Sequence, residues 1–148
     1  MALVYGQDER VTRWVAQQCG EDCPPPAYAS IGYERNGDLV AGVFFDGRTE
    51  TNLFAHIASS STLIPPEFLY AVARFAYEHL GVRRMTFMVK DSNIPCVRMV
   101  QGMGAICEAV LEHGHANGDT LLFVLWSDCS LYRRLRDKFD VKHELVTE

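Results

Sequence analysis

The pattern of residues 65–105 predicts a helix, a strand and a second helix with short connections. This order of elements constrains the possible folds more than any other feature of the sequence. Pro65 and Pro66 mark the start of the first helix. Proline lacks an N–H and is tolerated there because the N–H groups of the first turn have no acceptor within the helix. Apolar side chains then recur at helical spacing until Gly81, a residue type common just past a helix end. The first helix is therefore expected between Pro65 and Gly81.

The strand that follows is expected over Val82–Lys90, where the residues are β-rich and mostly apolar. Such a pattern favours a strand buried on at least one face. Residues 91–93 (Asp-Ser-Asn) offer cap side chains to a second helix that has Pro95 in its first turn, and Gly104 closes that helix.

Three antiparallel strands are predicted before this unit. Asn36-Gly37 suits a two-residue hairpin turn, so Tyr28–Arg35 and Asp38–Phe45 are expected to pair. Thr51–Ala58 alternates as a third strand. An amphipathic helix capped by Asp8 and ended by Gly20 precedes all three.

A long hairpin and a last helix are predicted after the central unit. Strands over residues 106–112 and 120–126 are separated by a loop, 113–119, that contains glycine. The last helix is expected over residues 131–139 and is rich in arginine, whereas the tail 140–148 has no decisive pattern. The whole order predicts an α+β fold with one mixed, mainly antiparallel sheet and helices on both faces.

Length and composition favour one domain over residues 1–148. The chain has 148 residues, 48% of them hydrophobic, enough for one sizeable core. Its net charge of −5 makes nucleic acid an unfavoured partner. No segment approaches the roughly 20 apolar residues of a spanning helix, and no signal peptide is visible, so no membrane partner and a cytoplasmic location are expected.

The five cysteines are expected to be reduced and to bind no metal. Cys19, Cys23, Cys96, Cys107 and Cys129 are an odd number and form no CxxC pair. A structural zinc site normally needs four ligands, and no second pair matches the spacing of the first two thiols.

This order of elements resembles the GNAT acyltransferases, in particular their short phage- and prophage-type members. The likeness covers about residues 8–139. Its most specific pieces are Gly81-Val82-Arg83-Arg84 leading into a strand, Asn93-x-x-Cys96, and Gly104 where the family has the glycine of a Gly-Phe pair.

The resemblance implies that an acyl-CoA lies where the fourth and fifth strands splay apart, with its diphosphate on backbone N–H groups at the start of the central helix. Acetyl-CoA is the expected acyl donor. The residues assigned to it by the resemblance are Ser60, Ser61, Thr62, Leu63, Ile64, Met88, Val89, Lys90, Asn93 and Cys96.

Acyl transfer to an amine needs a base, and His56 is the first candidate because it is expected near that splayed pair of strands. Glu50 is the second candidate. A packed, hydrogen-bonded histidine and a solvated charge are the competing interpretations. Tyr70 and Tyr77 are candidate proton donors, although their spacing also suits core packing. Cys96 is a candidate nucleophile, and the alternative interpretation is a buried structural thiol.

The predicted function is acyl-CoA-dependent N-acetyl transfer to an unknown amine acceptor. Two observations keep a catalytically inactive phage accessory protein open: residues 61–67 contain no glycine, and Val100 stands where the family often has a tyrosine acid. That alternative would bind a host or viral protein. A nucleic-acid base-modification protein, using Arg83, Arg84 and the last helix, is a third interpretation, and exposed sheet edges are compatible with a homodimer.

Overall fold

The computed structural model describes residues 2–20, 29–60 and 64–147, and the side chains of the last helix as far as Asp140. The elements in chain order are β1 (Ala2–Val4), α1 (Asp8–Gln18), β2 (Ala29–Arg35), β3 (Asp38–Asp46), β4 (Asn52–Ser59), α2 (Pro66–Arg74), the π-helical turn η1 (Phe75–His79), β5 (Arg84–Lys90), α3 (Ile94–Gly102), β6 (Ile106–His115), β7 (Gly118–Trp126) and α4 (Ser130–Thr147).

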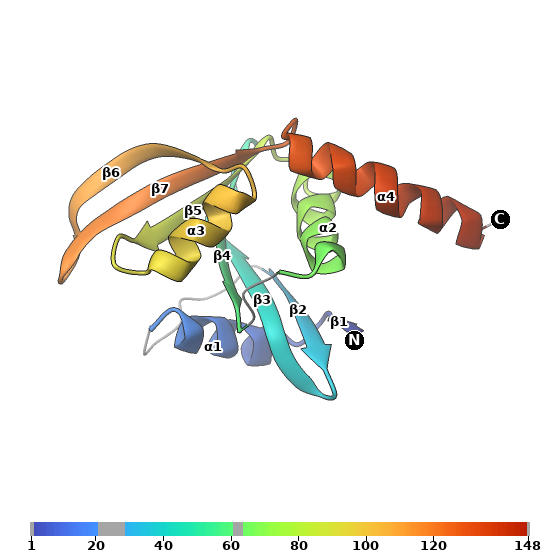
Figure 1. The fold of residues 1–148 in the computed structure, drawn as a ribbon, viewed down its shortest axis with the longest axis horizontal. Coiled ribbons are helices and arrows are strands. Elements are labelled where there is room, and N and C mark those ends of the chain that lie inside the picture. The colour runs from blue at the N-terminus through green and yellow to red at the C-terminus, as the bar shows by residue number, and fades with distance from the viewer. Residues whose placement is uncertain (1, 21–28, 61–63, 148) are drawn as a thin grey trace.

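The described strands form one seven-stranded sheet in the order β1-β2-β3-β4-β5-β7-β6. Neighbouring strands run antiparallel except β4 and β5, which are parallel. In Figure 1 the β6–β7 hairpin sweeps away from the body on one side and α4 extends on the other. The predicted mixed, mainly antiparallel α+β fold is confirmed.

Helices cover both faces of the sheet (Figure 1). On the first, which we call the α1 face, Val11 and Val15 of α1 pack in one buried cluster with Phe44 of β3. On the opposite face, the α2 face, Phe68 of α2 and Val100 of α3 belong to a larger cluster that includes strand residues on both sides of the β4–β5 junction. The helix α4 packs against α2. One core therefore spans the junction and a smaller core lies under α1.

The predicted Asp8 cap is wrong: Asp8 is the first residue of α1, the N-cap position is Gln7, and no side chain caps this helix start.

Other local signals placed turns and caps correctly. Asn36 and Gly37 both have positive φ angles, 53° and 85°, as the hairpin turn between β2 and β3 requires. The Asn93 side chain accepts a hydrogen bond from the Cys96 N–H and so caps α3. Gly81, at φ 74°, follows the central helix.

The structure differs from the sequence prediction in the last third of the chain. The expected loop 113–119 is mostly strand: β6 reaches His115, and only Ala116-Asn117 turns before β7. His113, at φ 54°, lies where the register shifts, an irregularity that the alternation pattern does not reveal. The last helix was predicted to end at Phe139, whereas α4 continues to Thr147.

Candidate active site

The parallel strands β4 and β5 pair only at their beginnings. Their register joins Asn52 to Arg84, Leu53 to Met85 and Phe54 to Thr86 and then stops. Yet β4 continues to Ser59 along β3, and β5 continues to Lys90 along β7. Because each strand is held on its outer side, the two inner edges diverge and leave a wedge between them.

Two adjoining cavities occupy this wedge. The inner one, about 40 Å³, is lined by Cys19, Ala55, His56, Ile57, Phe87, Met88, Val89, Lys90, Asn93 and Cys96. The outer one, about 680 Å³, is lined by Gln18, Cys19, Ile57, Ala58, Ser59, Ile64, Asn93, Ile94, Pro95, Cys96, Arg98 and Met99. The end of α1, the start of α3 and the second halves of β4 and β5 therefore converge on one site.

The wedge brings together seven of the residues predicted from the sequence: His56, Ile64, Met88, Val89, Lys90, Asn93 and Cys96. Sequence reasoning missed Arg98 and the α1 residues Gln18 and Cys19. Their place depends on how α1 lies across the sheet, which a local pattern does not reveal. Ser61, Thr62 and Leu63 lie outside the described residues.

The start of α2 offers fewer free amides than the diphosphate prediction assumed. The Ser60 N–H donates to the Val40 carbonyl at 2.9 Å, so this amide is already used. Pro65 and Pro66 have no N–H. The Glu67 carboxylate, which would repel a diphosphate, accepts a hydrogen bond at 3.0 Å from Tyr33 on β2. That bond holds the carboxylate toward β2 and the α2 face.

His56 is held in place from two directions. Its ring stacks on Phe44 at 4.3 Å between centroids, and its Nε2 lies 3.2 Å from Oδ2 of Asp46 on β3. Only 16% of the side chain is exposed. When Nε2–H donates to Asp46, Nδ1 keeps a lone pair that can accept a proton. The two interpretations of His56, a packed and hydrogen-bonded histidine and a candidate base, are therefore compatible with each other.

Asp46 was not among the predicted site residues. Its only sequence signal was the Asp46-Gly47 turn, which indicates a strand end and not a catalytic partner. The register pairs Phe44 with His56 and Asp46 with Phe54, so Asp46 lies two residues along β3 on the same face as His56. Glu50, the second predicted base, lies elsewhere: it is exposed in the connection before β4, at the opposite end of that strand from the cavities.

The candidate proton donors point away from the wedge. Tyr70 OH donates to Asp140 of α4, and Tyr77 OH donates to the Leu125 carbonyl at 2.5 Å. Burial raises the pKa of Tyr70 to about 12 and raises that of Tyr77 further. Both hydroxyls therefore serve the packing of the central helix, α2 with η1, against its neighbours, and this is the alternative interpretation of these residues.

Cys96 has the environment of a structural thiol. Burial, with a smaller contribution from Cys19, raises its pKa to about 12, so the thiol stays protonated at neutral pH. No histidine or carboxylate is recorded as its partner among the described residues. Nor do the described residues contain a group of three or more His, Cys, Asp or Glu side chains that could hold a metal ion.

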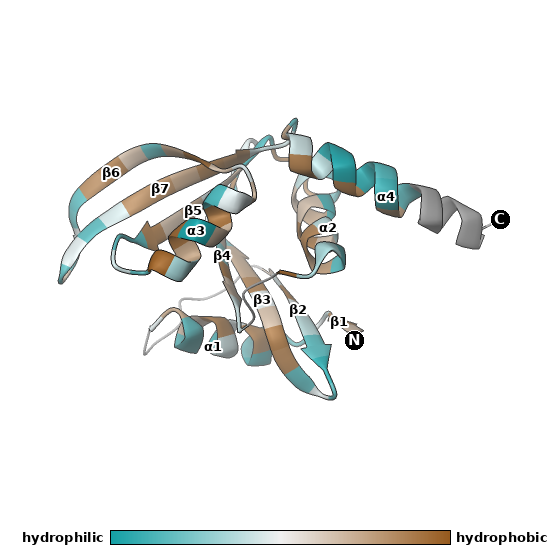
Figure 2. Ribbon diagram, viewed as in Figure 1, coloured by the Kyte–Doolittle hydropathy of each residue, from teal (hydrophilic) through white to brown (hydrophobic). Residues whose placement is uncertain are grey.

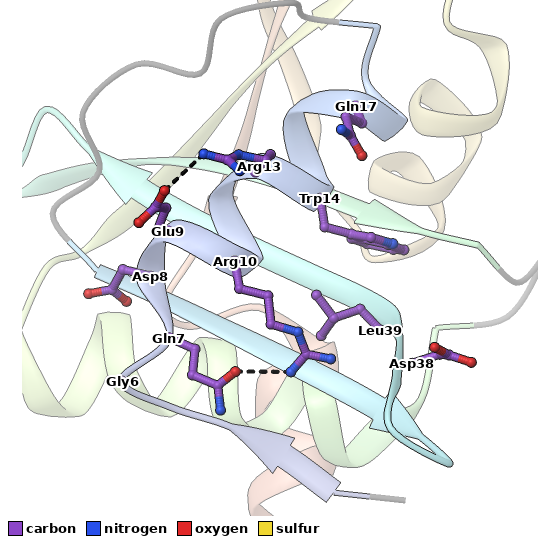
Figure 3. Close-up of a pocket in the computed structure, with 10 residues that line it drawn as sticks. All are labelled: Gly6, Gln7, Asp8, Glu9, Arg10, Arg13, Trp14, Gln17, Asp38 and Leu39. Carbon is purple, nitrogen blue, oxygen red and sulfur yellow. Dashed lines mark hydrogen bonds and ion pairs between the residues drawn. The ribbon is translucent and has the colours of Figure 1, made fainter.

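A further cavity of about 750 Å³ lies along the outer side of α1 (Figure 3). Its two arginines are already engaged by neighbours. Arg10 binds Gln7 at 3.0 Å and Glu34 at 3.1 Å, and Arg13 binds Glu9 at 2.8 Å. The cavity therefore offers no unpaired cation to a ligand and is not assigned a function.

Solved structures share this fold at low sequence identity. The spermidine/spermine N-acetyltransferase SpeG from Vibrio cholerae aligns with a TM-score of 0.68 and 11% identity, covering 90% of this chain and 97% of its own. YncA from Salmonella typhimurium, solved with acetyl-CoA, aligns at 0.65 and 12%, covering 86% and 94%. A GNAT-family acetyltransferase from Streptococcus pneumoniae aligns at 0.62 and 14%, covering 84% and 98%.

These likenesses establish the fold: the chain has the fold of the GNAT acetyltransferases. No family model matches the sequence, and no curated protein does. No helix in the described part of the chain is both long and apolar enough to cross a membrane.

Proposed function

We propose that the protein transfers an acetyl group from acetyl-CoA to an amine. The observation that carries this proposal is the wedge between β4 and β5, with a histidine–carboxylate pair at its inner end and the larger cavity at its mouth. Solved acetyltransferases that share the fold over nearly their whole length, SpeG and YncA among them, support the proposal, and YncA was solved with acetyl-CoA.

The side chains of the outer cavity fit the parts of acetyl-CoA. Ile57, Ile64 and Met99 offer apolar surface for a pantetheine arm. Arg98 is a cation suited to phosphate, and Lys90 lines the inner cavity beside it. Bound acetyl-CoA would supply the acetyl group as an activated thioester. The unpaired inner edge of β5 would supply backbone N–H groups that polarise the thioester carbonyl.

His56 is the proposed base. It takes a proton from the acceptor ammonium at Nδ1 while Asp46 holds the ring through Nε2. The amine nitrogen then bonds to the carbonyl carbon as the carbon–sulfur bond breaks, and CoA leaves as the thiol. The balance is one ammonium and one thioester to one amide, one thiol and one released proton.

Calorimetric titration of acetyl-CoA, repeated with CoA alone, tests the donor site first. Micromolar binding, roughly −8 kcal/mol, is the expected result. The matched variants are Arg98→Ala, expected to weaken binding, and Arg133→Ala on the exposed side of α4, expected to leave it as in the wild type. No detectable heat, together with an unchanged melting temperature in excess acetyl-CoA, would overturn the proposal.

A GNAT-fold binding protein without catalysis is the second candidate. It is favoured by the engaged Ser60 amide, by the prolines that begin α2, and by Val100, which is fully buried where a tyrosine acid would stand. The base-modification interpretation gains no support from Arg84, because Glu108 binds this guanidinium at 2.8 Å. Absence of acetyl-CoA binding in the same titration would favour this second candidate.

A further inference from the structure

Part of the α1 face carries exposed apolar side chains. The helix α1 packs on β2, β3 and β4, whereas large apolar side chains of β5, β7 and β6 remain exposed around Thr86 and Val124, which are buried on the same face. The exposed fractions are 49% for Met88, 63% for Ile106, 45% for Leu111 and 43% for Trp126. Figure 2 shows the apolar colour running along β6 and β7.

The strand registers place these side chains on one face. Met88 pairs with Leu122, Ile106 with Val124, and Leu111 with Thr120, and paired residues point to the same side of a sheet. Because alternate residues of β7 share a face, all of these lie on the side that also holds Trp126. We call Met88, Ile106, Leu111, Leu122 and Trp126 the sheet patch.

The sheet patch begins at the candidate active site. Met88 lines the inner cavity together with His56, and both residues are on the α1 face. From Met88 the same face continues through Leu122 on β7 to β6, where Ala109 pairs with Leu122. A molecule lying on this patch would therefore have one end beside His56.

The shape of the patch favours a polypeptide over a small molecule. Three strands about 4.8 Å apart, with nine residues in β7, make a broad, open face. Small ligands bind in concave sites, so an extended chain fits this open face better than a small molecule does. The two register shifts in β6 interrupt its outer edge, so an occupant is expected on the face and not as an added strand.

Charge complements this arrangement. Arg84 pairs with Glu108 beside the sheet patch, and the Asp46 carboxylate lies at the inner end of the wedge, where it binds His56. An ammonium is therefore favoured at the wedge and apolar groups beyond it. Lys90, two residues after Met88 on β5, lies nearer the mouth of the wedge, and its charge suits the phosphates of acetyl-CoA.

We propose that the sheet patch seats the acceptor, and that the acceptor is a polypeptide whose reactive amine is flanked by apolar residues. This inference rests on the proposed acetyl transfer. A second copy of the chain seated on Met88 would cover the rim of the wedge, so we assign the patch to the acceptor and make dimerisation an outcome of the test.

The probe is a degenerate peptide library with one fixed lysine, incubated with acetyl-CoA and sequenced after enrichment of acetylated products. We expect apolar residues beside the acetylated amine well above their input frequency. Ile106→Glu should abolish this preference and lower peptide turnover about tenfold. The matched control is Val110→Glu, which carries the same charge on the same strand but on the α2 face, where Val110 is 53% exposed. It should keep the preference.

The outcomes separate the two proposals. Failure of the wild type to bind acetyl-CoA would count against acetyl transfer itself. Acetyl-CoA binding with no acetylated peptide, with flanks at input frequency, or with an equal effect of both glutamates would overturn the acceptor seat alone. Light scattering that shows a wild-type dimer converted to a monomer by Ile106→Glu, but not by Val110→Glu, would also overturn it and assign the patch to a second copy.

Discussion

Nε2 of His56 lies 3.2 Å from Oδ2 of Asp46, and the two residues reach each other from neighbouring antiparallel strands at the inner end of the wedge. The stack on Phe44 fixes the plane of the ring while the carboxylate fixes its rotation. Such a pair orients one ring nitrogen and leaves the other available, which is the arrangement that a general base needs.

Removing the histidine should therefore affect turnover more than donor affinity. His56→Ala is expected to lower kcat about 100-fold or more, with a small change in acetyl-CoA Kd, because a base acts on the acceptor proton. Asp46→Asn should lower kcat less, since an amide can still hold the ring. Steady-state kinetics and calorimetry measure the two effects.

The control for this pair is His79→Ala, a histidine stacked on Phe75 at the end of the central helix and away from the wedge. Its turnover should match the wild type. Unchanged turnover in a folded His56→Ala variant would remove His56 from the mechanism.

Cys96 should resist alkylation in the folded protein. With a pKa of about 12, its thiolate fraction at about pH 8 is of order 10⁻⁴, and the side chain is largely covered. Cys107 is exposed on β6 and should label first. Mass-spectrometric mapping of iodoacetamide adducts over time measures the order. Early labelling of Cys96 would show that the α3 end of the wedge opens, and a Cys107→Ser variant keeps the first site from obscuring it.

The ion pair between His115 and Asp91 should make stability depend on pH on the acid side. His115 Nε2 lies 3.1 Å from Asp91 Oδ1, and this hydrogen bond lowers the pKa of Asp91 below its ordinary value of about 3.9. A lowered folded-state pKa adds stability above the ordinary value, and that stability is lost as pH falls through the folded value. Asp91→Asn should therefore reduce the melting temperature at neutral pH and lose its effect as pH falls through the lowered pKa of Asp91 in the folded protein.

The control here is Asp137→Asn, which removes the same charge from the exposed side of α4. Melting temperatures of the three proteins across the acid range give the comparison. A constant difference between wild type and Asp91→Asn at every pH would contradict the assignment.

Two glycines should respond in opposite ways to alanine. A Cβ at Gly42 would lie 2.8 Å from Cγ2 of Val15, so Gly42→Ala should push α1 from the sheet and lower the free energy of unfolding by about 1–3 kcal/mol. Gly102, at the end of α3, has nothing within 4 Å of a Cβ, so Gly102→Ala should be neutral or stabilising by up to about 1 kcal/mol. Urea denaturation measures both, and equal effects would contradict the close approach of α1.

Local chemistry made much of the fold predictable. Asn36-Gly37 is one of the few residue pairs that suit a two-residue hairpin turn, so this turn was located from the sequence. Asn93 with Pro95 likewise indicated where α3 begins. The face of β4 that carries His56 followed from alternation. The π-helical turn over Phe75–His79 was missed, because its spacing of apolar residues does not differ from that of an α-helix over so short a segment.

The site was less predictable than the fold, because it is assembled by tertiary placement. His56 and Met88 were named from the sequence, but Asp46 and Arg98 join them only after strands and helices pack. The exposure of β6 was also hidden: Ile106 and Val110 look like core residues in the sequence, and both are more than half exposed.

The short junction between β4 and β5 has a consequence for how the protein holds together. Among the described residues, three strand pairs and two hydrogen bonds to the Thr51 carbonyl connect the backbone of the four-stranded part of the sheet to that of the three-stranded part. Asn52 adds side-chain hydrogen bonds to Arg84 and Thr86, and the rest of the connection is side-chain packing under α2 and α3. A ligand with amide groups of its own, inserted in the gap, would act as a missing strand between the two parts. Occupancy of the wedge would then set the cohesion of the whole sheet, and loss of ligand would loosen the molecule at its centre before its edges.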